Sequence, residues 1–274
     1  MKTVKIAGGQ GFYGDSPKAA IAIAKAKAAD YIVHDALAEL TLSILQKDKL
    51  QDASLGYARD IEFLATSLYP LAFANGIKIV SNSGGLNPEG AAKKVAAILA
   101  KQGIKGLKIA VVTGDDMLPR LKEIQEAGIP LENLDSGKPF SENKYEVLQS
   151  NVYTGAKSIA DALAQGANLV LAGRVADPCL TLGILVHHFG WSWDDWRMMA
   201  VGAACGHLLE CGSQVTGGVF WDPGFKDIPD PANIGFPIAE VTDTGGLVIT
   251  KPEGTGGVVD LRTVKEQLLY ELHD

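Results

Sequence analysis

The chain has 274 residues, and its 25 Lys and Arg against 32 Asp and Glu give a formal charge of −7. This acidity excludes a general nucleic-acid binder, because such proteins neutralise the phosphate backbone with clustered basic side chains. A hydrophobic share of 47% with 21% charged residues is typical of a folded globular protein and excludes a disordered one.

The first two thirds of the chain alternate short apolar runs with Ala-rich stretches of helical spacing. Apolar runs without polar alternation are typical of strands buried on both faces, and their alternation with helices predicts a mainly parallel sheet with helices on both faces. An open, doubly wound α/β sheet is the first choice, and an irregular barrel is the alternative. The predicted strands are Val4–Gly8, Tyr31–Asp35, Lys78–Asn82, Ile109–Thr113 and Leu169–Gly173, and the helices are Ser16–Ala28, Ala36–Gln46, Ala58–Asn75, Glu89–Gln102 and Gly155–Ala164.

The pattern changes after Gly173. Two consecutive helices are predicted at Pro178–Phe189 and Trp193–Ala204, with Ser192 or Asp194 as the cap of the second. A Gly- and Pro-rich stretch with short β-like pieces at Ala239–Thr242 and Leu247–Thr250 follows, and then a helix over Thr263–His273. We therefore divide the chain into an α/β domain, residues 1–214, and a small irregular β-containing segment with a terminal helix, residues 215–274. The segment packs on the domain, and a single domain is the alternative.

Cysteine spacing and the length of apolar stretches indicate the cellular compartment. The three cysteines show no CxxC spacing, which indicates a reducing environment without a disulfide framework. The N-terminus lacks a signal peptide, and no stretch reaches the roughly 18 apolar residues of a membrane span. We expect a cytoplasmic protein without a membrane partner. The 31 glycines exceed the usual share of roughly 7%, and we expect the excess in loops.

The loop after the first strand has the sequence GGQGFYGD. Its glycines allow tight turning, and the helix that follows favours an anion at its N-terminus. Gly11 and Asp15 are therefore candidate substrate-binding residues. The loop also matches G-x-G-x-x-G, although the acidic residue expected about twenty positions later fits Asp35 only loosely. A plain strand-to-helix turn explains the same residues.

Polar residues also follow the second and third strands. Asp35 and Glu39 come together at the predicted start of a helix, where two carboxylates bind a metal, divide acid and base roles, or complement the helix dipole. Asn82, Gly84 and Gly85 follow the third strand and offer an amide and backbone N–H donors for a carboxylate, phosphate or enolate oxygen.

The two remaining strands end in charged residues. Asp115 and Asp116 follow the fourth strand and are candidate ligands of a divalent metal, although Asp is also common where a helix begins. Arg174 follows the fifth strand and suits bidentate binding of a substrate carboxylate or phosphate. Asp177 would anchor Arg174 or act as a base, and a structural Arg–Asp pair is the alternative.

The densest polar segment is GHLLECGSQVTGG, residues 206–218. On a helical turn His207 and Glu210 face the same side, which suits a general acid and base or two metal ligands. Cys211 is a candidate nucleophile, although cysteines more often pack as inert core residues. Gln214 adds an amide for substrate binding.

Taken together, GGQGFYGD, SNSGGLNP, VTGDDM, LAGRVADP and GHLLECGSQVTGG resemble the acyclic terpene utilisation AtuA family over essentially the whole chain. The resemblance implies a role beside genes that degrade branched acyl compounds, such as citronellol and geraniol, through CoA thioesters. It also implies a homo-oligomer or a complex with a small companion subunit. Members of the family usually run beyond the position at which this sequence stops.

Three functions follow from these residues. The first is a lyase or hydratase that acts next to a carboxyl or thioester carbonyl, with His207 or Glu210 as base, Asn82 and Gly84–Gly85 as enolate cradle, and Arg174 as anchor. The second is a non-catalytic subunit that binds an acyl-CoA or nucleotide. The third is an NAD-dependent oxidoreductase that uses the glycine loop.

Overall fold

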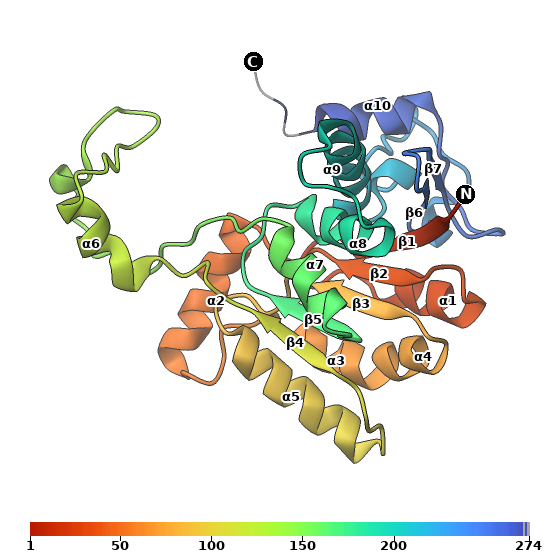
Figure 1. The fold of residues 1–274 in the computed structure, drawn as a ribbon. Coiled ribbons are helices and arrows are strands. Elements are labelled where there is room, and N and C mark those ends of the chain that lie inside the picture. The colour runs from red at the N-terminus through yellow and green to blue at the C-terminus, as the bar shows by residue number, and fades with distance from the viewer. Residues whose placement is uncertain (271, 273–274) are drawn as a thin grey trace.

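The core of the protein is one seven-stranded sheet in the order β4-β5-β3-β2-β1-β6-β7 (Figure 1). The computed structural model describes residues 1–270 and 272. β1 to β5 pair in parallel, and β6 and β7 add an antiparallel end. The sheet confirms the α/β class. Its strands are β1 Thr3–Gln10, β2 Tyr31–His34, β3 Lys78–Ser81, β4 Ile109–Val112, β5 Leu169–Ala172, β6 Ile238–Thr242 and β7 Leu247–Thr250.

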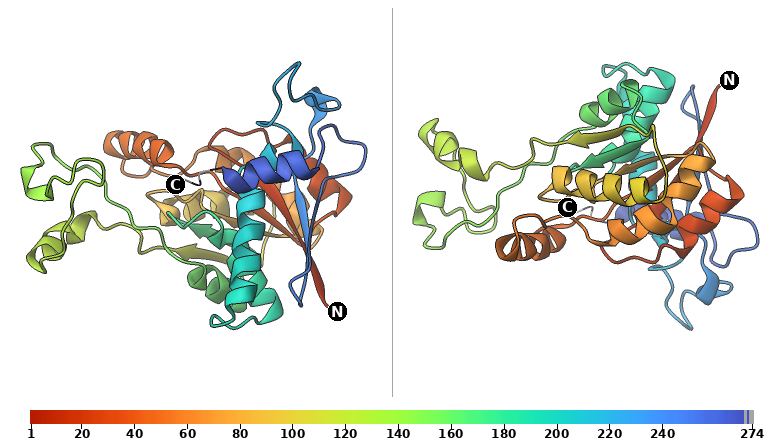
Figure 2. Two further views of the ribbon diagram at one scale, coloured as in Figure 1. Left: turned by 90° about the horizontal axis from the view of Figure 1, so that it is seen from above. Right: turned by 90° about the horizontal axis from the view of Figure 1, so that it is seen from below.

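Helices cover both faces of the sheet, as the two views of Figure 2 show. Residues of α1, α3, α4 and α5 pack on one face in a cluster that includes Ile32 and Ile79. Residues of α7, α8 and α9 pack on the other face with Val33 and Val80. The helices are α1 Lys18–Ala26, α2 Glu39–Gln51, α3 Asp60–Ser67, α4 Tyr69–Ala74, α5 Pro88–Lys101, α6 Leu121–Glu126, α7 Lys157–Ala164, α8 Cys179–Phe189, α9 Trp196–Glu210 and α10 Leu261–Leu269.

The Gly- and Pro-rich segment adds its strands to the same sheet. β6 pairs with β1, with Ala239 opposite Ile6, and β7 pairs with β6. α10 packs on α9 and on the short turn Gln214–Thr216 (η3). Residues 215–270 therefore share a sheet and a helix contact with the preceding part of the chain.

Neighbouring strands β3 and β5 send the chain to opposite faces of the sheet. β3 leads into α5 on one face, and β5 leads into α8 on the other. Because the two strands pair directly, with Ile79 opposite Leu169, a topological switch lies between their carboxyl ends. Ligands of open α/β sheets bind at such a point.

Several predicted helix boundaries were wrong. α2 begins at Glu39 because its N-cap Ala38 is extended, with φ −136° and ψ 174°. The predicted helix over residues 58–75 divides at Leu68, since Pro70 lies in the first turn of α4 and has no N–H to continue the earlier hydrogen bonds. α9 begins at Trp196 under an Asp195 cap, whose carboxylate accepts from Met198 N at 3.1 Å, and runs on to Glu210.

The terminal helix begins two residues earlier than predicted. α10 spans Leu261–Leu269, and Asp260 caps it by accepting from the N–H groups of Arg262 and Thr263. His273, the predicted end of this helix, lies outside the described residues.

The expectation that the excess glycine lies in loops was only partly right. Gly183, Gly202 and Gly206 lie inside α8 and α9, where they allow close packing. A Cβ on Gly206 would lie 2.5 Å from the Pro178 carbonyl oxygen, and one on Gly183 would lie 2.6 Å from Ile159 Cβ.

An arm leaves the body after β4 and returns before α7 (Figure 1). It contains α6 and the turns Leu118–Arg120 (η1) and Phe140–Glu142 (η2), and none of residues 116–155 is buried. Its base is closed by hydrogen bonds from Met117 N to Ser150 O at 2.7 Å and from Val152 N to Asp115 O at 2.8 Å.

No helix within residues 1–270 is both long enough and apolar enough to cross a lipid bilayer.

Candidate active site

Asp35 and Asn82 meet at the carboxyl ends of β2 and β3. The Asn82 amide donates from Nδ2 to Asp35 Oδ1 at 2.5 Å, and Asn82 Oδ1 accepts from Ala36 N at 2.7 Å. Both side chains are buried. Asp35 Oδ2 has no hydrogen-bond partner among the described residues. The amide therefore fixes the carboxyl group through one oxygen, and the second oxygen is buried without a hydrogen-bond partner in the described part of the chain.

Arg174 reaches the same place from the end of β5. Its Nη1 donates to Asp177 Oδ1 at 2.5 Å and to the carbonyl oxygens of Val175 at 3.2 Å and Leu37 at 3.5 Å. Its side chain is only 4% exposed. Arg174 Nε is buried and has no hydrogen-bond partner in the described part of the chain. The structure thus brings Asn82, Arg174 and Asp177 together around Asp35.

Two exposed side chains cover the Arg174 guanidinium. Glu39, at the start of α2, accepts from Nη2 at 3.3 Å and also from the Tyr153 hydroxyl. The Tyr153 ring lies 4.2 Å from the guanidinium carbon. Tyr153 belongs to the returning end of the arm, so the arm supplies part of the cover over the buried charge.

The loop after β3 is tightly built. Gly85 N donates to Asn82 O at 3.1 Å, which uses one of the donors expected for an enolate oxygen. A Cβ on Gly84 would lie 2.5 Å from the Ala172 carbonyl oxygen, so Gly84 permits β3 and β5 loops to touch. Gly84 and Gly85 therefore allow the tight backbone path that places the Asn82 amide against Asp35.

Asp115 and Asp116 are engaged with the backbone. Asp115 Oδ2 accepts from Arg174 N and from Asn151 Nδ2, each at 2.9 Å, and Asp116 Oδ1 accepts from Leu118 N at 3.0 Å. No group of three His, Cys, Asp or Glu side chains in residues 1–270 is arranged to hold a metal ion. Asp115 orients the Arg174 loop, and a metal at this pair stays a prediction.

The glycine loop after β1 folds around Asp15. Asp15 accepts from Gly11 N at 3.0 Å and from Ser16 N at 2.7 Å. A Cβ on Gly11 would lie 2.5 Å from the Cys211 carbonyl carbon, so this loop packs on the end of α9. Asp15 thus engages backbone N–H groups of the glycine loop, and NAD binding at this loop stays a prediction.

His207 and Glu210 face each other as predicted, but at the contact between α9 and α10. His207 Nδ1 lies 3.0 Å from Glu210 Oε1, and Nε2 donates to Gln267 O at 2.6 Å. Gln267 Nε2 donates back to His207 O at 2.7 Å. Both ring nitrogens of His207 thus face acceptor oxygens, and the group joins the two helices. Cys211 is the C-cap that follows α9, and buried Gln214 begins the next turn.

The model of the acyclic terpene utilisation family protein AtuA matches residues 4–274 of the chain. The chain belongs to the AtuA family. No curated protein and no solved structure matches it.

In this AtuA-family chain, burial raises the pKa of Asp35 to about 7, and the negative charge of Asp177 adds to the rise. The Asn82 hydrogen bond and the Arg174 charge act in the opposite direction. A carboxyl group with this pKa exchanges a proton near neutral pH, as a general acid or base requires.

The sequence pattern leaves Asp35 and Glu39 open between metal binding, acid and base roles and the helix dipole, and it does not identify Tyr153 or Asp60. Asp60 accepts from Gly14 N at 2.9 Å and from Gln10 Nε2, so it fixes the glycine loop from the start of α3. Tyr153 follows no strand, and nothing in its sequence context places it over Arg174.

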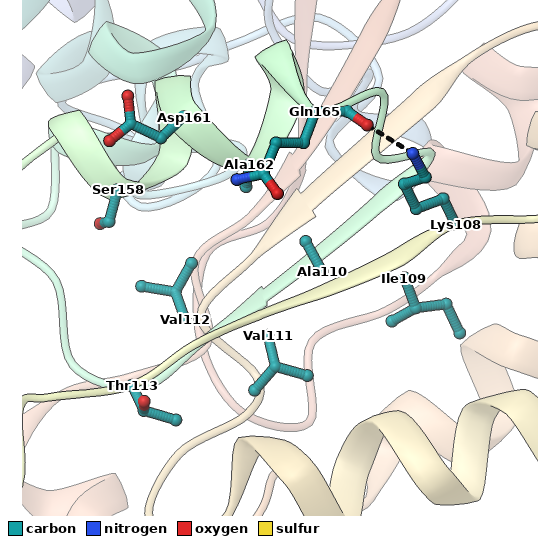
Figure 3. A pocket seen from close by; sticks show the side chains of 10 residues that line it. All are labelled: Lys108, Ile109, Ala110, Val111, Val112, Thr113, Ser158, Asp161, Ala162 and Gln165. Atoms are coloured by element: carbon teal, nitrogen blue, oxygen red, sulfur yellow. Dashed lines mark hydrogen bonds between the residues drawn. The ribbon is translucent and has the colours of Figure 1, made fainter.

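A groove of about 570 Å³ runs along the outer edge of β4 beside α7 (Figure 3). Its walls combine aliphatic side chains of β4 with polar side chains that include Ser158 and Asp161, and Lys108 Nζ donates to Gln165 O at one end at 2.6 Å. It has no paired buried polar groups like those around Asp35 among its lining residues. The candidate chemistry of the AtuA-family chain therefore lies at the carboxyl ends of the strands and not in this groove.

Proposed function

We propose that the protein is an enzyme of carboxylic-acid or thioester catabolism that removes a proton next to a carbonyl group, with Asp35 as the base. The observation that carries the proposal is the meeting of Asp35, Asn82 and Arg174 at the switch between β3 and β5. Membership of the AtuA family supports branched acyl compounds as the substrate class.

Each residue has a role in this reaction. Arg174 holds the negative oxygen of the substrate, because its buried guanidinium keeps a donor without a partner among the described residues. Asp35 Oδ2 accepts the proton from the carbon next to the carbonyl, and the electron pair moves into an enolate. Asn82 holds Asp35 in place through Oδ1. To complete a hydro-lyase reaction, the electron pair of the enolate forms a carbon–carbon double bond, the bond to the β-hydroxyl oxygen breaks, and this oxygen leaves as water with the proton that Asp35 accepted.

This proposal places the base at Asp35 in preference to His207 or Glu210. The two ring nitrogens of His207 already face Glu210 and the Gln267 carbonyl. A base needs an oxygen that can accept the substrate proton. Asp35 Oδ2 has no hydrogen-bond partner in the described part of the chain, and the Arg174 charge acts on this carboxyl group.

The test is hydrogen exchange in D2O with a panel of branched acids and their CoA thioesters, followed by mass spectrometry. Asp35→Asn is expected to lower the exchange rate by roughly 100-fold or more, since a positioned base contributes about that much. His207→Gln is the matched comparison and is expected to retain most of the rate. Retained exchange in Asp35→Asn together with loss in His207→Gln would return the base to α9.

A binding subunit that works with a partner chain is the second candidate, and the arm favours it. Ile129, Leu134 and Tyr145 are more than half exposed on a segment without a buried residue. Exposed apolar residues of this kind are typical of protein contacts. Exchange catalysed by the isolated chain would exclude a purely non-catalytic role.

A further inference from the structure

The Arg174 guanidinium is satisfied on one side and incomplete on the other. Nη1 has three oxygen acceptors, from Asp177, Val175 and Leu37. On the other side Nη2 makes the longer contact to exposed Glu39, the exposed Tyr153 hydroxyl also interacts with the guanidinium, and Nε has no partner among the described residues. Because Nε–H and an Nη2–H of arginine point the same way, this side is a fork that matches two oxygens of one carboxylate.

Glu39 fills this fork only in part. Its oxygen Oε1 reaches Nη2 at 3.3 Å, and no contact joins it to Nε. The side chain is 72% exposed, in contrast to the buried arginine that it meets. An exposed carboxylate pays side-chain entropy for its contact and competes with water, so ion pairs of this kind contribute little.

The same Glu39 oxygen accepts from the Tyr153 hydroxyl, and the Tyr153 ring lies over the guanidinium. This hydroxyl holds the pKa of Glu39 below its usual value, with the Arg174 charge as a smaller cause. Glu39 is therefore a carboxylate anion in contact with both Arg174 and Tyr153 in the resting protein.

We propose that Glu39 is an internal stand-in for the substrate, and that a carboxylate of the substrate displaces it to bind Nε and Nη2 of Arg174 together. The inference rests on the proposed function, since it names the group by which that substrate is held. Tyr153 then closes over the bound carboxylate from the arm. Asp35 lies close enough to Arg174 for their charges to interact.

The charges around the fork favour a carboxylate over a phosphate. Asp177 already pairs with the single positive charge of Arg174, and Asp35 lies close enough to act on it electrostatically. A second negative charge on the ligand would face these carboxylates without a further cation at the fork among the described residues. A monoanion therefore fits the site better than a dianion.

The experiment is a titration of the intact protein with butanoate, followed by the 15N NMR signal of Arg174 Nε–H. Butanoate is expected to shift this signal in a saturable way. Glu39→Gln is expected to bind butanoate about 2- to 5-fold more tightly, the factor that corresponds to loss of one exposed ion pair. Glu89→Gln is the matched control, since Glu89 is also an acidic residue in the first turn of a helix, and its affinity is expected to be unchanged.

Two further variants complete the design. Tyr153→Phe keeps the ring and removes the hydroxyl that holds Glu39, and is expected to bind more tightly than the wild type. Arg174→Lys removes the fork and is expected to abolish saturable binding, which is measured here by calorimetric titration because this variant has no Arg174 Nε–H signal. Unchanged affinity in Glu39→Gln, or a Nε–H signal that does not respond to butanoate, would overturn the proposal.

Phosphate serves as the second probe. Saturable binding of inorganic phosphate at least as tight as that of butanoate would overturn the carboxylate assignment. These measurements do not depend on turnover. Failure of the Asp35 exchange experiment with a positive butanoate result would therefore reject the base and keep the carboxylate site.

Discussion

His34 and Asp35 are adjacent, and burial acts on them with opposite sign. Burial lowers the pKa of His34 to about 3 and raises the pKa of Asp35 to about 7. In both cases the neutral form is favoured, because the charged form loses its hydration. At neutral pH His34 is therefore uncharged, while Asp35 is present in both its protonated and its ionised form.

The pH dependence of stability tests the environment of Asp35. A raised folded-state pKa stabilises the fold below the unfolded value near 4, and this contribution is lost as the pH rises to about 7. Relative to Asp35→Asn, the wild type is expected to lose a few kcal/mol over that interval and to change little above it. Urea unfolding between pH 4 and pH 8 measures the difference, and a constant difference would contradict the burial of this charge.

The contact between α9 and α10 gives a second residue-scale prediction. His207→Gln is expected to lower the free energy of unfolding by about 1–3 kcal/mol, because Glu210 and the Gln267 carbonyl lose a shared partner. His187→Gln, on the less constrained α8 surface, is expected to stay within about 0.5 kcal/mol. Urea titrations compare the two, and equal losses would reject the joining role of His207.

Residue types predicted the site only in part. Asn82, Arg174 and Asp177 were identifiable because each follows a buried strand, and strand ends meet at one edge of a parallel sheet. His207 and Glu210 are also polar side chains and face each other as their spacing predicts. They lie, however, where α9 packs on α10. Sequence spacing predicts that two side chains share a face, and does not predict what packs against that face.

At the scale of elements, the buried strands were predictable and the first turns of helices were not. Each predicted parallel strand overlaps its observed counterpart, because a short continuous apolar run is stable mainly when both of its faces are buried in the core. α2 starts late because Ala36 N is bound to the Asn82 side chain and Leu37 O to Arg174. The site holds this stretch extended, which local propensity does not predict.

Close packing of α7 on α8 gives an element-scale prediction. Gly183→Ala is expected to cost about 1–3 kcal/mol, because its Cβ would lie 2.6 Å from Ile159 Cβ and 2.8 Å from the Ala156 carbonyl oxygen. Gly155→Ala, where no heavy atom lies within 4 Å, is the control and is expected to be neutral or slightly stabilising. Thermal unfolding measures both, and a neutral Gly183→Ala would contradict this packing.

At the scale of the whole molecule, the arm is the least integrated part of the chain. Replacing residues 118–149 by a short Gly-Ser linker is expected to change the free energy of unfolding by less than about 1 kcal/mol, because the arm buries none of its residues and its base is already closed. Replacing buried Gln214–Thr216 in the same way is expected to cost more. A large loss on removing the arm alone would show that it supports the fold.

The antiparallel pairing of β1 with β6 has a consequence for how the protein is made. On the ribosome β2 follows β1 early, but β6, the strand that covers the other side of β1, is translated only after β2 to β5. A nascent chain therefore carries an open strand edge until β6 is made, and such edges recruit foreign strands. The cell must protect this intermediate, so slower translation or scarce chaperones would reduce the soluble yield before any effect on the finished fold.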